Sequence, residues 1–230
     1  MLRVCEDVGR AISRDEETAL LEACRASRSR SLFPAVLIAL NTCMRYSELR
    51  LLKWRQVNLT SCTLTVGQSK TESGTGRLFP LNDRSIAIWG SWGSLFPGVK
   101  ASHFVFPAGR YGASGDGVTV IYENDPTKPI GRWKEARESA KKRANVSCRF
   151  HDLRHMGCTR ILEAGVPFSV VATIMGWSPS TTVRMSRRYG HIGQSAQRHA
   201  VNALKEAGIQ DDGAQNWAQP HGVRIKQLAN

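Results

Sequence analysis

The stretch HDLRH, residues 151–155, places two imidazoles and a guanidinium at the start of a segment with helical spacing. On a helix, His151, Arg154 and His155 fall on one face, because residues three and four apart are neighbours. Apolar residues on either side predict that this helix packs into a core, where a charge is costly unless it is paired. The cluster therefore needs a partner, and the alternatives are an internal carboxylate, a metal ion and an anion supplied by a ligand.

The metal alternative comes from Cys148, His151, His155 and Cys158, which form the pattern C-x2-H-x3-H-x2-C. Zinc binds these ligand types. Structural zinc sites, however, usually take two ligand pairs from separate turns, whereas these four residues share one short segment. The six cysteines, at 5, 24, 43, 62, 148 and 158, are widely spread without a C-x-x-C pair, which is typical of reduced thiols. We therefore expect no metal and no cofactor.

The charge balance favours the anionic alternative. Lys and Arg total 32 against 19 Asp and Glu, so the formal net charge is +13. Such an excess favours a polyanionic partner, nucleic acid first, over a small neutral substrate. The longest apolar run, LFPAVLIAL, is about half a membrane span, and the first twenty residues contain acids and do not form a secretory signal. We expect a cytoplasmic protein without a membrane partner.

The hydrophobic pattern predicts an α+β protein that is mostly α-helical. Ser13 and the acids after it predict the start of a helix, and further helices are expected at about 32–43, 44–54 and 82–92. Leu49, Leu52 and Trp54 are expected to point inward. Between the helices expected at 44–54 and 82–92, alternating apolar residues around the sequence SGTG predict a β-hairpin. A small antiparallel β-sheet is therefore expected near the hairpin 62–81.

The second half of the chain is expected to begin with a long surface loop and to continue as helices. Residues 107–130 are rich in Gly, Pro and Asp and contain one strand-like stretch, VTVIY. An amphipathic helix follows at 131–146, another begins at His151 and ends near Gly165, and two more follow. We predict one domain over 13–207, an N-terminal extension at 1–12 and a C-terminal tail at 208–230.

Five separated motifs together resemble a known family. In chain order they are CMRYSELRLLKWRQV, SK ahead of TGRLFPL, HDLRH, MGWS and RRYGHI. This order is similar to that of the catalytic domain of the tyrosine recombinases, the phage integrase family, over about residues 13–205. The resemblance implies a helical catalytic domain that cuts and rejoins DNA strands through a 3′-phosphotyrosine. It also implies double-stranded DNA as the partner, a homo-oligomer (tetramer) on that DNA, accessory DNA-bending proteins, and a bacterial or phage protein associated with the nucleoid.

The resemblance also implies a role for particular residues. Tyr189 would be the nucleophile, and Arg45 and Arg154 would grip the scissile phosphate, since a planar guanidinium stays charged and can bond two oxygens. Arg154 would thus meet the anion that the HDLRH cluster needs. Lys70 would protonate the 5′-oxygen that leaves, and His151 would exchange a proton with the nucleophile.

Three further residues complete the set that the resemblance implies. Trp177 occupies the position at which most members have histidine; indole donates a hydrogen bond but cannot exchange protons. Glu48 and His155 would support the other groups. From Trp177 to Tyr189 the interval is twelve residues, about three longer than we expect for the family, so a longer loop or helix must deliver the nucleophile.

Two alternatives to a recombinase remain open. A type IB topoisomerase-like enzyme that relaxes DNA would use the same residue types but work alone, and a DNA-binding remnant or regulator would keep the basic surface without catalysis. The presence of Tyr189 favours catalysis, because a binding remnant has no need of it. The chain begins where the catalytic domain begins, so we also expect that the N-terminal core-binding domain is absent and that DNA binding is weak.

Overall fold

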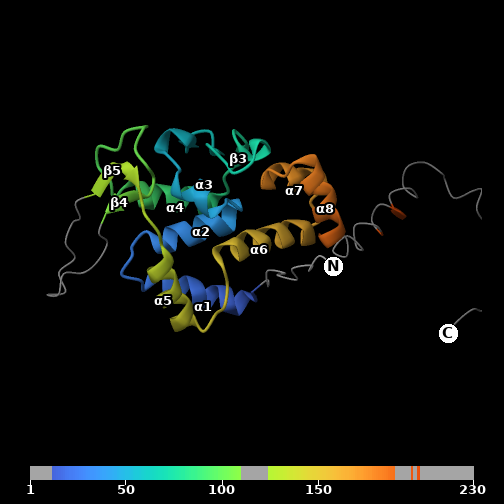
Figure 1. The fold of residues 1–230 in the computed structure, drawn as a ribbon, viewed down its shortest axis with the longest axis horizontal. Helices are drawn as coiled ribbons and strands as arrows, with labels where there is room; N and C mark the ends of the chain where they lie inside the picture. Colours follow the sequence, from blue (N-terminus) through green and yellow to red (C-terminus); the bar gives the residue numbers. More distant parts are fainter. Residues whose placement is uncertain (1–11, 110–123, 190–197, 199–200, 203–230) are drawn as a thin grey trace, which may run out of the picture.

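A computed structural model of the chain describes residues 12–109, 124–189, 198 and 201–202. Nearly all of the predicted N-terminal extension, the strand expected at 118–122 and the predicted tail at 208–230 lie outside these residues. The described part contains helices around a central helix, with a small antiparallel sheet at the top of the view and a two-stranded ribbon at its left (Figure 1).

The central helix is α2, Leu32–Thr42, which is buried along most of its length. Helix α1, Arg14–Arg25, packs against it and also contacts α5. A capping box starts α1: the Ser13 hydroxyl accepts from the Glu16 N–H, and the Glu16 carboxylate accepts from the Ser13 N–H. These bonds satisfy two of the N–H groups that a helix start leaves unpaired, so the predicted helix start at Ser13 is confirmed.

The helix expected at 44–54 is shorter than predicted. Helix α3 covers Tyr46–Arg50, and a separate 3-10 helix, η1, covers Trp54–Gln56. Between them the chain is extended: the Val105 N–H donates to the Leu52 carbonyl at 2.9 Å, and the Trp54 N–H donates to the His103 carbonyl at 3.0 Å. These bonds to a distant segment replace helical bonds, which is why the continuous helix was a wrong prediction. Leu49 and Leu52 are buried as expected, and Trp54 is partly buried.

The predicted hairpin is confirmed as part of a three-stranded antiparallel sheet. Strands β1, Val57–Asn58, β2, Thr63–Thr65, and β3, Leu78–Pro80, lie in the order β1-β2-β3. Leu64 lies opposite Phe79, and both are buried. The long turn between β2 and β3 contains the 3-10 helix η2, Glu72–Gly74, and helix α4, Asp83–Gly93, follows β3.

The expected long loop at 107–130 is structured at both ends, so that prediction was wrong there. Strand β4, Pro107–Gly109, pairs antiparallel with β5, Asn124–Pro129. Helix α5, Lys134–Ala144, then begins after Trp133. The Trp133 ring is buried against the rings of Phe106 and Phe150, so it fastens the start of α5 to the core.

Three helices form the C-terminal part of the described chain. Helix α6, Phe150–Glu163, contacts both α2 and α7, Phe168–Met175, and α8, Pro179–Tyr189, follows. Gly165, with φ of +78°, lies just beyond the end of α6, as predicted. Helices α7 and α8 lie at one end of the molecule (Figure 1). They share a small apolar cluster with α6 that contains Cys158, Val171, Met175 and Tyr189.

The predicted fold class is therefore confirmed: the protein is mostly helical with a small antiparallel sheet at the predicted hairpin. Within the described ranges, no helix combines the length and hydropathy that crossing a membrane requires. In the same residues, no three Cys, His, Asp or Glu side chains gather in an arrangement that could hold a metal ion.

Candidate active site

Glu48, in helix α3, is the centre of a buried hydrogen-bond network. Its carboxylate accepts two bonds from the Arg77 guanidinium, at 2.7 and 3.0 Å, and one from Arg45 Nη1 at 2.7 Å. The Ser69 hydroxyl, from the turn between β2 and β3, donates to the same carboxylate at 2.6 Å. Glu48 therefore ties the start of α3 to the turn of the hairpin.

The Glu48 carboxylate is ionised in this network. Burial opposes its charge, but the hydrogen bonds and the charge of Arg77, together with bonds from Ser69 and the Arg45 N–H, lower the pKa of Glu48 to about 2. One negative charge thus faces two guanidinium groups. The cluster keeps a net positive charge that an anion can neutralise.

Arg154, in α6, is buried beside this network. Its Nη1 donates to the Cys43 carbonyl at 2.5 Å, and its Nη2 donates to the Met175 carbonyl. Backbone carbonyls at the ends of α2 and α7 therefore hold this guanidinium. Carbonyl oxygens at helix C-termini favour a cation, but they leave its charge unneutralised and use two of its five N–H donors.

The charge of Arg154 is retained despite its burial. Burial, followed by the positive charges of Arg45 and Arg77, lowers the pKa of Arg154 to about 10, which still leaves it protonated at neutral pH. Three guanidinium groups thus lie close enough to repel one another, with one carboxylate between them. Such a site favours a bound anion. Of the two arginines that bond Glu48, Arg45 is the more accessible, with 19 % of its side chain exposed against 4 % for Arg77.

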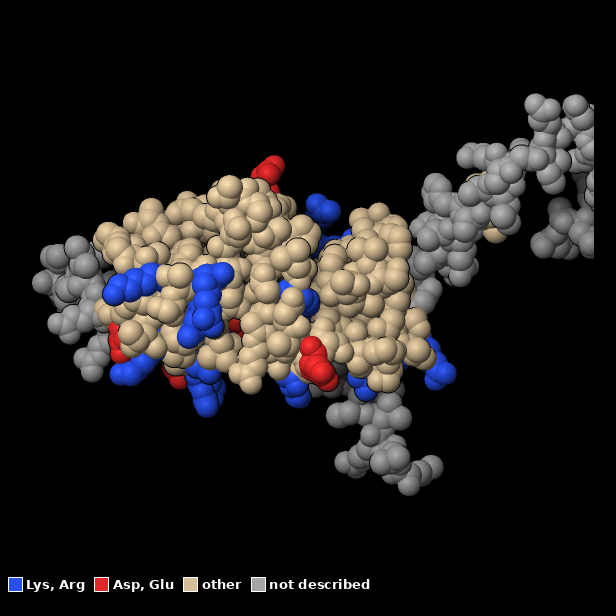
Figure 2. Space-filling view, turned by 90° about the horizontal axis from the view of Figure 1, so that it is seen from above, with Lys and Arg blue, Asp and Glu red and all other residues tan. Residues whose placement is uncertain are grey.

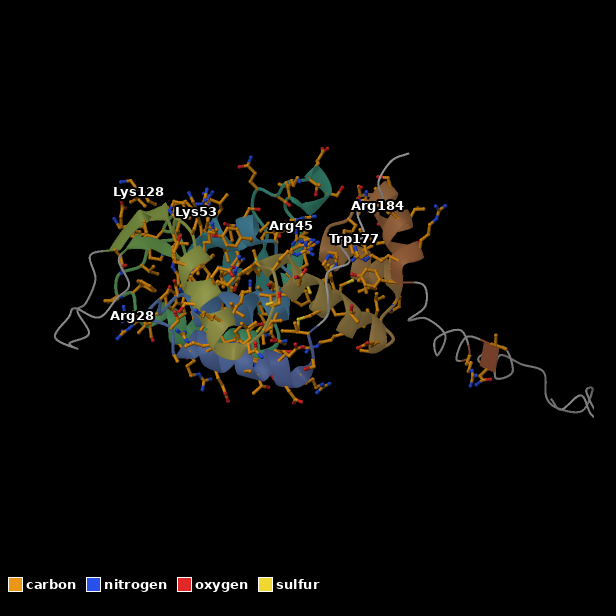
Figure 3. The ribbon with its side chains drawn as sticks, turned by 60° about the horizontal axis from the view of Figure 1, so that its bottom comes forward. Arg28, Arg45, Lys53, Lys128, Trp177 and Arg184 are labelled. Atoms are coloured by element: carbon orange, nitrogen blue, oxygen red, sulfur yellow. The ribbon has the colours of Figure 1, made fainter. Side chains whose placement is uncertain are left out.

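Two glycines allow the close approach of the elements that carry these arginines. A Cβ atom on Gly74, in the hairpin turn, would lie 2.9 Å from Arg45 Nη1. A Cβ atom on Gly176, which follows α7 with φ of +57°, would lie 2.8 Å from the Gly74 Cα and 3.1 Å from Arg77 Nη1. The hairpin turn, α3 and the α7–α8 turn therefore meet at one place. Figure 3 shows Arg45 near the middle of the molecule, with Trp177 on the α7–α8 side.

Tyr189 is the last residue of α8 and is buried. Its hydroxyl lies 2.8 Å from His155 Nδ1, and its ring stacks on Trp177 with 6.4 Å between the centroids. The interval of twelve residues after Trp177 is thus largely taken up by a helix, one of the two possibilities predicted from its length. Burial raises the pKa of Tyr189 above its ordinary value, and the adjacent Cys158 acts in the same direction, whereas Arg188 and Arg154 oppose the rise.

His155, rather than His151, is the histidine in contact with Tyr189. Burial, then the charges of His151 and Arg188, lower the pKa of His155 to about 4, so its ring is neutral at physiological pH and one ring nitrogen can accept a proton. His151 is more exposed, and its ring centroid lies 4.6 Å from that of His155 at 87°. Burial and the charge of Arg154 also lower the pKa of His151.

Lys70 and Trp177 complete the set predicted from the sequence. Lys70 follows Ser69 in the hairpin turn and is exposed; within the part of the chain that the structure describes, no hydrogen bond or ion pair joins it to the arginines. Trp177 is partly buried against Phe168 as well as Tyr189. Of the eight predicted residues, six contact another predicted residue or belong to the Glu48 network; they are Arg45, Glu48, His151, His155, Trp177 and Tyr189. Arg154 lies beside the Glu48 network. Lys70 follows Ser69, which belongs to that network.

Sequence reasoning missed Arg77 and Ser69. Arg77 immediately precedes β3, and alternation along the strand places it on the same side as buried Phe79. An arginine at an inward position of a strand requires a buried acidic partner. That signal could have identified Arg77 from the sequence, whereas nothing local distinguishes Ser69 from an ordinary loop serine.

The fold and the site together define a helical domain in which the guanidinium groups of Arg45, Arg77 and Arg154 lie close to one another and a buried tyrosine contacts α6. The sequence profile of the phage integrase family matches residues 10–195. The chain belongs to the phage integrase family.

Individual relatives agree with this assignment. The integrase of Salmonella phage P22 is 27% identical over 190 residues, a match that covers 77% of this chain and 42% of that protein. The chain thus matches less than half of the length of this relative. The solved catalytic domain of bacteriophage HP1 integrase superposes with a TM-score of 0.56 at 22% identity, covering 83% of this chain and 92% of that one. A Tn1549 transposon integrase, solved in complex with transposon right end DNA, gives a TM-score of 0.65 at 18% identity, covering 89% and 68%.

Proposed function

We propose that this chain is the catalytic domain of a site-specific recombinase that cuts and rejoins DNA strands through a 3′-phosphotyrosine. The observation that carries the proposal is the placement of Tyr189 against His155, one residue from Arg154, whose guanidinium lies beside those of Arg45 and Arg77. This arrangement supports the proposal because it would bring together a nucleophile, a proton acceptor and a cationic site for an anion. This combination is what attack on a phosphodiester requires.

The proposed chemistry assigns one task to each group. The Tyr189 oxygen attacks the phosphorus, its bond to phosphorus forms, and the bond between phosphorus and the 5′-oxygen breaks. Arg45 and Arg154 stabilise the charge on the non-bridging oxygens, and the Trp177 indole N–H adds a donor. Lys70 supplies the proton to the departing 5′-oxygen, and its exposed position on the hairpin turn leaves it free to approach bound DNA.

The nucleophile's proton goes to His155 in this proposal. A neutral imidazole 2.8 Å from the hydroxyl is placed to accept it. His151 lies beside it, and a charge on His151 would oppose protonation of His155. Glu48 holds Arg45 and Arg77 in place and takes no part in proton transfer, because its low pKa keeps it ionised.

The proposed partner is double-stranded DNA. On the face seen in Figure 2, Lys and Arg side chains outnumber the Asp and Glu side chains scattered among them. Lys53, Lys128 and Arg184 lie on different elements in Figure 3. Such a surface favours a polyanion. A homo-oligomer on DNA, accessory DNA-bending proteins and a location with the nucleoid belong to the same proposal.

Trapping a covalent intermediate tests the proposal. Nicked duplexes of randomised sequence would be incubated with the protein and separated on a denaturing gel. The short fragment that begins with the freed 5′-hydroxyl diffuses away at the nick, so the cleaved strand stays attached through its 3′-phosphate. We expect a protein–DNA adduct with the wild type and none with Tyr189→Phe. Equal duplex binding and equal melting temperature of the variant are the control.

The adduct assay, together with assays of duplex binding, plasmid relaxation and Holliday-junction formation, separates the alternatives. Duplex binding without an adduct would favour a non-catalytic remnant or regulator. An adduct together with plasmid relaxation, but without Holliday junctions between two sites, would favour a topoisomerase-like enzyme. An adduct that persists in Tyr189→Phe would contradict the assignment of the nucleophile.

A further inference from the structure

A second basic site lies next to the active site. It is a pocket of about 360 Å³ between the first turns of α5 and α6 and helix α3. Its polar wall consists of four cationic side chains, and its apolar wall consists of the Tyr46 and Phe150 rings, with His151 at one edge. The cations are Arg132, Lys134, Arg137 and Arg149.

The positive charge of this pocket is only partly compensated. Arg137 pairs with Glu138 at 3.0 Å, and Arg149 pairs with Asp152 at 3.1 Å. Neither carboxylate belongs to the pocket lining. Arg132 and Lys134 make no ion pair or hydrogen bond within the ranges that the structure describes. Among the described residues, Arg132 and Lys134 thus leave the pocket positive, and the N-terminal ends of α5 and α6 add positive partial charge.

Aromatic contacts hold the apolar wall of the pocket in place. The Tyr46 ring packs edge-on against both Trp133 and Phe150, with centroid distances of 5.6 and 5.2 Å. The Tyr46 hydroxyl also accepts a bond from the Trp133 N–H at 3.3 Å. These contacts fix the residues on either side of Trp133, which are Arg132 and Lys134.

The pocket shares its elements with the active site. Tyr46 follows Arg45 in the chain, and His151 precedes Arg154 by one helical turn. The starts of α3 and α6 therefore contribute residues both to the pocket and to the arginine site. DNA carries a phosphate at every step of its backbone. If one phosphate of a strand binds at Arg45 and Arg154, neighbouring phosphates of the same strand therefore lie close to these arginines.

We propose that this pocket binds a second backbone phosphate of the DNA strand whose scissile phosphate is held by Arg45 and Arg154. The inference rests on the proposed function. A contact of this kind fixes the position of the strand without reading its sequence. It would align the scissile phosphate with Tyr189 from the side opposite to α7 and α8.

The salt dependence of DNA binding tests this proposal. The double variant Arg132→Gln/Lys134→Gln removes the two pocket cations that have no acidic partner among the described residues. The control is Arg84→Gln/Lys100→Gln, which removes the same charge from two exposed residues outside the pocket, in α4 and in the loop after it. The dissociation constant of a fluorescein-labelled duplex would be measured by anisotropy over a range of KCl concentrations, with melting temperatures to confirm folding.

We expect the plot of log affinity against log salt to lose about 0.9 of its slope in the pocket variant, the amount associated with one phosphate. The control variant should keep the wild-type slope. Equal changes in the two variants would overturn the proposal, because they would mean that only net charge matters.

Inorganic phosphate identifies the source of the bound group. At constant ionic strength, it should weaken duplex binding by the wild type more than duplex binding by the pocket variant, in which only the site at Arg45 and Arg154 is left to take phosphate. Phosphate that binds the wild type without affecting the duplex would overturn the proposal in favour of a free-phosphate site. The covalent adduct is measured separately, so a changed salt slope without any adduct would contradict the proposed function and still support the pocket.

Discussion

Glu48 is the residue on which the arrangement of the arginines depends most. Its carboxylate is buried and bonds Arg45, Arg77 and Ser69. If it were removed, the Arg77 guanidinium, which is only 4 % exposed, would stay buried without a negative partner. Breaking such a pair by changing one member typically destabilises a protein by about 3–5 kcal/mol.

We therefore predict that Glu48→Gln lowers the free energy of unfolding by about 3 kcal/mol or more in urea denaturation. Glu138→Gln is the matched control, because Glu138 pairs with Arg137 and Lys141 at the surface. Exposed pairs contribute about 1 kcal/mol or less. Similar losses in the two variants would show that the Glu48 network is not a structural centre.

His155 gives the protein a defined pH dependence. In the unfolded chain it would take up a proton near pH 6.5, whereas in the folded protein it stays neutral down to about pH 4. Between these values the unfolded state binds more protons, so stability falls as the pH falls. Each pH unit changes the free energy by at most about 1.4 kcal/mol for one proton.

We predict that the wild type loses up to about 2 kcal/mol of unfolding free energy between about pH 6.5 and 5, and that His155→Gln loses less. Urea denaturation at several pH values measures both. His103→Gln, in the loop before β4, is the control that leaves His155 in place. Because His151 also has a lowered pKa, some dependence should remain in the variant; an unchanged dependence would contradict the role of His155.

The sequence indicated which residues are candidates for the site, but it did not indicate which of them contact one another. The motif order selected Arg45, Arg154 and Tyr189, and the structure places the two arginines close to one another and Tyr189 against the helix that carries Arg154. Which histidine meets the tyrosine depends on where α8 ends relative to the face of α6. That relation is set by tertiary packing against Trp177 and Cys158, and no local pattern encodes it.

At the scale of elements, the site depends on the close approach of the hairpin turn and the α7–α8 turn. Gly176 makes this approach possible, since it has a positive φ and no Cβ to meet Gly74. Gly165 also has a positive φ, but a Cβ atom there would meet nothing within 4 Å. An alanine at Gly165 would therefore cost only backbone strain, whereas an alanine at Gly176 would cost backbone strain and a steric clash with Gly74.

We predict that Gly165→Ala lowers stability by about 1 kcal/mol, the cost of a left-handed backbone for a residue with a side chain. Gly176→Ala should lower it by at least twice that amount and should slow strand cleavage, because the hairpin turn that bears Ser69 must shift. Thermal unfolding and single-turnover cleavage measure the two effects. Equal stability losses, with unchanged cleavage in both variants, would contradict the account.

Helices were more predictable than strands for a physical reason. Ser13, Gly165 and the apolar period identify helices through local signals that act within a few residues. Strand β5 has the sequence NDPTKP, in which Pro and Asp disfavour a strand. It forms because β4 and the segment around Phe104 pair with it. Such pairing over a distance in sequence cannot be read from local propensity.

At the scale of the whole molecule, the net charge of +13 should dominate DNA binding. We predict that log affinity for duplex DNA falls linearly with log salt, with a slope of about −0.9 for each phosphate contacted. Contact with six phosphates would correspond to a loss of about 10³-fold between about 50 and 200 mM salt. Anisotropy titrations measure this, and an affinity that does not change with salt would contradict the electrostatic account.

The protein class was predictable because five motifs occur in one order, whereas any single motif would have been uninformative. A lone Arg45 would be an ordinary surface residue and a lone Tyr189 an ordinary core residue. The basic pocket beside α5 could not be predicted, since its residues come from α3, α5 and α6. Only the folded chain brings them together.

The identity of the residue that becomes attached to DNA tests the central claim most directly. The trapped adduct would be digested with nuclease and protease, and the nucleotide-bearing peptide would be sequenced by mass spectrometry. The chain has four tyrosines, at 46, 111, 122 and 189, so the assignment has a built-in comparison. We predict a 3′-nucleotide on Tyr189 alone; a nucleotide on any other side chain would contradict the account.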